Sequence, residues 1–219
     1  MKPARMRGAT AIRIVALALV LCPLHAHAHL IATGLGPVYD GIIHFALTPE
    51  DLIPAVALAL FAGLRGKDHA RCAMFVLPLA WLAGGVAGTS IAAQLPASLA
   101  WLPLLVLGAL VASDLRLPLA ATTAIALLLG GFLGYANGVA MAQAGPGTRA
   151  IIGISGTVFV AMTLVAALVT AWQSGWARIA WRVLGSWIAA SGLLLLGWSL
   201  LDARLPDIGG AFPRIIAHA

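Results

Sequence analysis

The stretch YDGIIHFALTPEDL, residues 39–52, gathers charge in a chain that has very little of it. Three of the seven acidic residues, Asp40, Glu50 and Asp51, lie in this stretch, together with His44. Across the whole chain, 9% of the side chains are charged and 62% are hydrophobic. The clustering of carboxylates in so apolar a sequence therefore needs a physical reason.

The composition predicts an all-α membrane protein. A chain of 219 residues with so few polar side chains cannot cover a water-soluble globule, so the bilayer is its expected solvent. The formal net charge of +6 is typical of cytoplasmic loops that face anionic lipid, and it does not imply nucleic acid. The two cysteines, Cys22 and Cys72, exclude a disulfide framework and lack the spacing of a metal motif.

The N-terminus resembles a secretory signal peptide. The basic MKPARMR precedes the apolar AIRIVALALVLCPL, and the small-residue pattern Ala26-His27-Ala28 predicts cleavage before His29. Residues 1–28 are then a signal peptide, and an uncleaved first helix is the alternative. A terminal His29 would offer a metal ion both its imidazole and its α-amine, unless this histidine is incidental to the cleavage site.

Six apolar runs follow, and each is compared with the ~20 residues that a spanning helix needs. They lie near 38–64, 72–94, 98–113, 117–142, 150–173 and 179–201. No long linker divides them, so residues 29–219 are predicted to form one transmembrane domain of six helices.

Basic residues predict the orientation of these helices. With the mature N-terminus outside, the inside loops include 65–71 and 113–116 and carry six Lys or Arg residues, against three outside. The charge bias and the signal peptide both predict a bacterial inner-membrane protein whose two termini are periplasmic.

The first apolar run is predicted to be broken near Thr48-Pro49. Proline is favoured at the first position of a helix, and threonine is favoured as the cap before it. A helix from Pro49 to Leu64 is about 24 Å long, which is shorter than the ~30 Å hydrocarbon core. Irregular backbone at that depth is tolerated inside protein or beside a water-filled cavity, where transporters often place their substrate sites.

The acidic residues allow two interpretations. A carboxylate at bilayer depth costs about 2.5–3.5 kcal/mol, so it needs a cavity, a partner or a cation. Asp40 and His44 share a helix face at i and i+4, from which both could reach one metal ion. Glu50 and Asp51 could be further ligands, or Asp51 could complete a capping box with Thr48.

Two short motifs resemble the HupE/UreJ family of membrane proteins. GIIHFALTPEDL (41–52) is similar to the family's first-helix signature, in which a histidine is followed by an Asp-His pair. FLGYANG (132–138) resembles the second motif, which is rich in glycine, aromatic residues and histidine. The resemblance implies a signal peptide, six helices and a permease for nickel or cobalt.

The chain departs from the family pattern at several motif positions. His44 is retained, but Glu50 replaces the aspartate, Asp51 replaces the histidine of the pair, and Leu133 and Asn137 replace two further histidines. Oxygen ligands favour harder metals such as manganese or magnesium, so the metal could differ from nickel or cobalt.

The predicted function is an inner-membrane permease or facilitator for a divalent metal cation, with membrane lipid as its surroundings. No enzyme motif and no tightly bound cofactor is predicted, and the oligomeric state is not predicted. The alternative is a membrane accessory protein that binds a periplasmic metal, peptide or protein partner without transport. The predicted metal ligands are His44, Asp40, Glu50, Asp51, His29 and Asn137.

Overall fold

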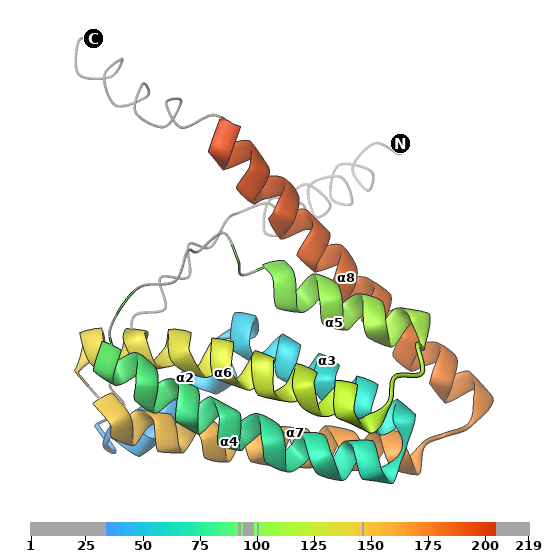
Figure 1. The fold of residues 1–219 in the computed structure, drawn as a ribbon, viewed down its shortest axis with the longest axis horizontal. Helices are drawn as coiled ribbons and strands as arrows, with labels where there is room; N and C mark the ends of the chain where they lie inside the picture. Colours follow the sequence, from blue (N-terminus) through green and yellow to red (C-terminus); the bar gives the residue numbers. More distant parts are fainter. Residues whose placement is uncertain (1–33, 92, 94–98, 100, 146, 205–219) are drawn as a thin grey trace, which may run out of the picture.

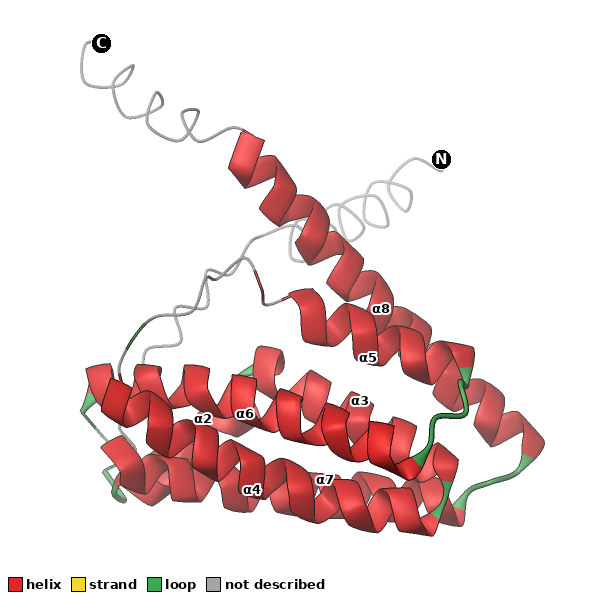
Figure 2. Cartoon of the chain, in the orientation of Figure 1, coloured by secondary structure: helices red, strands yellow, loops and turns green. Residues whose placement is uncertain are grey.

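The protein is described by a computed structural model that covers residues 34–91, 93, 99, 101–145 and 147–204. The predicted signal peptide and His29 lie outside the described residues. Figure 2 shows that the described chain is helical, and no strand is found within it. The all-α fold class is confirmed. The helices are α2 (Pro37–Leu47), α3 (Pro49–Arg65), α4 (Lys67–Ile91), α5 (Trp101–Ser113), α6 (Leu119–Ala144), α7 (Gly147–Ala171) and α8 (Gly175–Arg204).

Within the described residues, four helices are long and apolar enough to cross a membrane, namely α4, α6, α7 and most of α8. The count is five when α2 and α3 form one span that is bent by 73°. Helix α5 has 13 residues and reaches about 20 Å at 1.5 Å per residue. The chain is therefore a helical membrane protein, and the count of six spans stays a prediction.

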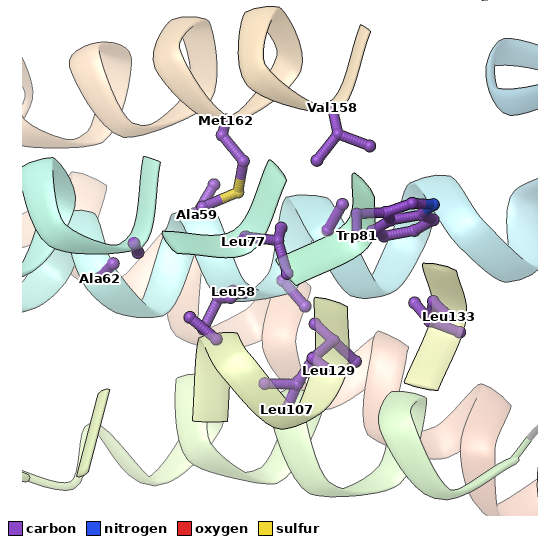
Figure 3. Close-up of a cluster of buried hydrophobic side chains, with 14 of the residues drawn as sticks. Leu58, Ala59, Ala62, Leu77, Trp81, Leu107, Leu129, Leu133, Val158 and Met162 are labelled. Carbon is purple, nitrogen blue, oxygen red and sulfur yellow. The ribbon is translucent and has the colours of Figure 1, made fainter. Parts of the chain in front are cut away.

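Helix α3 lies at the centre of the packing and contacts α4, α5, α6 and α7. In Figure 3, Leu58 and Ala59 of α3 lie among buried side chains from the surrounding helices. Alanine and leucine dominate α3, so neighbouring helices approach it from several sides. Figure 1 shows α5 and α8 as a separate pair, from which α8 extends beyond the other helices.

Helices α4 and α6 pack closely because glycines line their interface. A Cβ atom on Gly134 would collide with the backbone of Trp81, and one on Gly138 would collide with the backbone of Gly85. The same order of contacts along both helices means that they run parallel. Small residues allow such close approach in a bilayer, where apolar burial between helices contributes little.

One end of the bundle collects the α3–α4, α5–α6 and α7–α8 junctions, and we call it the basic end. Asp114, just after α5, pairs with Arg65 of α3 and Arg178 of α8, the latter at 2.6 Å.

The sequence predicts a seven-residue loop over 65–71, which is wrong. Gly66 alone separates α3 from α4, and its φ of 115° is a conformation that glycine adopts readily.

Candidate functional site

The break between α2 and α3 places the candidate site. Pro49 has no backbone N–H and occupies the first position of α3, so α2 ends at Leu47. Thr48 is extended, as residues before proline prefer, and its hydroxyl donates to the carbonyl of His44 over 2.7 Å. The predicted break of the first span is therefore confirmed at Thr48-Pro49.

Three of the predicted site residues meet beside this break. Nε2 of His44 on α2 lies 3.9 Å from Oδ2 of Asp51 on α3. Nδ2 of Asn137 on α6 donates to Oδ1 of Asp51 over 3.0 Å and to the carbonyl of Leu133 over 2.9 Å. We call His44, Asp51 and Asn137 the polar triad. It joins both motifs of the sequence through side chains on three helices.

The triad is nearly shielded from solvent. The side chains of His44 and Asp51 are 12% and 7% exposed, and Asn137 is buried. Among the described residues, Oδ1 of Asn137 is one of the buried polar atoms without a hydrogen-bond partner. A buried acceptor without a partner is costly, so this oxygen is available to a cation or to a donor such as water.

An aromatic pair that the sequence analysis did not identify lies next to the triad. Phe45, which follows His44, packs edge to face against Trp81 of α4, with ring centroids 5.7 Å apart. Both side chains are fully buried. Because Trp81 also contacts Gly134 on the Asn137 helix, it links the break to the α4–α6 interface. The glycines of α6 are the local sequence signal of this close approach.

The capping-box interpretation of Asp51 is wrong. Thr48 makes no side-chain capping bond to α3, and its N–H donates to the carbonyl of Phe45 instead. The Asp51 carboxylate faces Asn137 and His44 rather than the start of its own helix. Asp51 nevertheless lies in the first turn of α3, where the helix dipole favours a negative charge.

The remaining predicted ligands are Glu50 and Asp40, which the structure describes, and His29, which lies outside the described residues. Glu50 is exposed on the first turn of α3, and Asp40 is partly exposed one turn before His44 on α2. Within the described residues, no group of three or more His, Cys, Asp or Glu side chains is placed to hold a metal ion. The triad therefore provides one imidazole, one carboxylate and one amide.

These three groups are compatible with transient binding of a divalent cation. Two ligands that each lie ~2.1 Å from one ion can be at most ~4.2 Å apart, so the 3.9 Å between His44 and Asp51 can be bridged by one ion. Imidazole suits nickel, cobalt and zinc, and carboxylate or amide oxygen suits harder ions. A sparse set of ligands also releases its ion readily, which a transport pathway requires.

Comparison with known proteins was informative at the level of the family. No curated protein and no solved structure matches the chain significantly. A family model described as "HupE / UreJ protein" matches residues 17–195, which include every helix from α2 to α7, most of α8 and all three residues of the triad. The match covers well over half of the sequence, and the chain therefore belongs to the HupE / UreJ family.

Proposed function

We propose that the protein is a permease or facilitator for a divalent transition-metal cation, with the polar triad as its central binding site. The HupE / UreJ family is associated with nickel and cobalt transport or maturation. The observation that carries the proposal is the placement of His44, Asp51 and Asn137 together at a break in a membrane helix. Breaks of this kind allow polar groups to line a passage at bilayer depth.

The location of the triad along α3 supports a passage that is open toward one side. Asp51 is in the first turn of α3 and Arg65 is its last residue, so about 20 Å of helix separates the triad from the basic end. If the basic end is cytoplasmic, as the positive-inside rule predicts, the triad lies nearer the periplasm. A cation from the periplasm would then reach His44 before it meets the apolar side chains of α3.

The basic end forms an electrostatic barrier at the end of α3 that is opposite to the triad. Asp114 holds Arg65 and Arg178 together there, and Arg182 donates to the carbonyl of Ala112 over 2.9 Å. The positive charges of these three arginines raise the electrostatic cost of bringing a divalent cation to this end. We infer that release of the cation on this side requires the end of α3 and the start of α8 to separate. The ion pairs of Asp114 then control this separation.

Metal flux into sealed proteoliposomes tests the proposal. Uptake of nickel, cobalt, manganese and zinc is measured for the wild-type protein and for His44→Ala. We expect saturable uptake of at least one of these ions by the wild type, and a loss of at least tenfold in the variant. Normal uptake by His44→Ala would remove the triad from the transport pathway.

Binding without flux would support the alternative of an accessory protein. In that case isothermal titration would show metal binding by the wild-type protein in detergent, while sealed vesicles would take up no more metal than empty ones. The two measurements together separate transport from binding, because only flux depends on a continuous path across the bilayer.

A further inference from the structure

A groove lies between the start of α4 and the end of α7 at the basic end, far from the triad. Its volume is about 290 Å³. This is close to the ~300 Å³ lower bound of small-molecule sites. It can hold a headgroup and the beginning of one chain rather than a whole lipid. The lining residues are Lys67, Ala70, Arg71, Met74, Thr163, Ala166, Ala167 and Thr170.

The groove is polar at one end and apolar at the other. Lys67 and Arg71 are four residues apart on α4 and share a helix face at the end of the bundle. Met74 lies one turn further from the end of the bundle, opposite the turn of α7 that contains Thr163. The hydroxyl of Thr163 donates to the carbonyl of Phe159 over 2.7 Å, so the deeper wall presents mainly carbon atoms.

No acidic side chain that the structure describes neutralises the positive charge in the groove. Neither Lys67 nor Arg71 forms an ion pair with any residue that the structure describes, and both are exposed. The nearby acid Asp114 is occupied by Arg65 and Arg178. Asp68 is also exposed at the start of α4, but it does not line the groove. The two cations are therefore free for an external anion.

We propose that this groove binds an anionic phospholipid. Lys67 and Arg71 hold the phosphate at the membrane surface, and one acyl chain runs inward along Met74, Ala166 and Ala167. Basic pockets between membrane helices are suited to acidic headgroups, because both the charge and the adjoining apolar wall are matched. A soluble phosphate would use the two cations but would leave the apolar half of the groove uncovered.

Native mass spectrometry of the full-length protein in detergent tests the headgroup contacts. Phosphatidylglycerol and phosphatidylcholine with identical chains are the probes. We expect stronger retention of phosphatidylglycerol, and about fivefold weaker retention after Arg71→Gln, since one basic side chain near the surface contributes that much. Arg116→Gln is the matched control, because Arg116 is an exposed arginine in the α5–α6 junction that does not line the groove.

A second pair of variants tests the apolar half. Ala167→Phe fills the groove without changing its charge, and Leu164→Phe places the same ring on an exposed part of α7 that does not line the groove. We expect only Ala167→Phe to weaken phosphatidylglycerol retention. If Arg71→Gln is not monodisperse, Lys67→Gln replaces it, with the same expected direction.

Three results with the two lipids and the variants would overturn the proposal. These are equal retention of the two lipids, an equal loss in Arg116→Gln, and an unchanged affinity in Ala167→Phe. Displacement of phosphatidylglycerol by equimolar glycerol 3-phosphate would also overturn it, because the groove would then be a site for soluble phosphate. None of these measurements depends on metal flux, so failure here is distinguishable from failure of the transport proposal.

Discussion

The amide of Asn137 on α6 donates to the carboxylate of Asp51 on α3 over 3.0 Å, and so joins residues 86 positions apart in the sequence. This bond connects the two motifs that the sequence analysis singled out. Asp51 is buried, so the loss of its partner leaves a polar group unsatisfied inside the protein. The bond therefore has consequences for stability that can be measured separately from transport.

A double-mutant cycle of Asn137→Ala and Asp51→Ala is expected to show coupling of about 1–2 kcal/mol in the free energy of unfolding. The coupling arises because each single variant breaks the same hydrogen bond. Unfolding in mixed detergent micelles, followed by circular dichroism, gives the four free energies. Additive effects of the two substitutions would contradict the direct contact.

The neighbouring carboxylates Glu50 and Asp51 should differ in function. Asp51→Asn keeps the shape of the side chain but removes its negative charge from the triad, so we expect at least a tenfold loss of metal uptake. Glu50→Gln makes the same chemical change on an exposed side chain and is expected to retain most of the uptake. Equal losses in both variants would mean that the overall negative charge at the break matters, and not the triad.

The ion pairs of Asp114 should stabilise the basic end. Asp114→Asn keeps a residue that tolerates the observed φ of 54°, so its effect reports on charge and not on backbone strain. We expect a loss of about 3 kcal/mol, because the buried Arg65 side chain loses its partner. Arg178→Gln removes the more exposed partner and should cost less. Thermal unfolding in detergent measures both, and the reverse order would contradict this assignment.

The interface between α4 and α6 can be tested with two nearby glycines. Gly134→Ala places a methyl group against the backbone of Trp81, so it should lower the unfolding temperature. Gly131→Ala is the matched control, since a Cβ there meets no atom within 4 Å. Alanine is favoured over glycine in helices by about 1 kcal/mol, so this control should be neutral or stabilising. Equal destabilisation by both would contradict the close packing.

The positive-inside rule predicts that the basic end of the bundle is cytoplasmic. A reporter fused after Ala219 is expected to behave as exported, and a cysteine in place of Arg116 should react only with a reagent that enters the cytoplasm. Labelling of this cysteine from the outside of intact cells would reverse the assignment. The reporter after Ala219 would then be expected to behave as cytoplasmic.

Much of the fold could be predicted from the sequence, because the apolar runs and the Thr48-Pro49 break are local signals. The predicted spans near 117–142 and 150–173 overlap almost fully with α6 and α7. The one-residue junction at Gly66 was missed, because the charged residues of RGKDHAR (65–71) indicated a loop, whereas they end α3 and begin α4. Charge alone does not distinguish a loop from an exposed helix end.

The site was predicted in part. His44, Asp51 and Asn137 were identified from their motifs, but their mutual contact depends on how α3 packs against α6, which no local pattern specifies. The role of Asp51 was left open between ligand and cap for the same reason. The Phe45–Trp81 pair was not identified, because buried aromatic residues are common in any helical core.

The parallel packing of α4 and α6 also constrains how the protein is assembled. His69 and Thr122, which contact each other at 2.9 Å near the starts of these helices, are 53 residues apart. The intervening helix α5 packs against α8 and α3 instead. During synthesis, the glycine face of α4 therefore stays uncovered until α6 has been made. The face of α5 that contacts α8 stays uncovered until α8 has been made. The α4–α6 and α5–α8 interfaces thus form only after a helix that is not the next one in the sequence has been made, and the last of them requires α8.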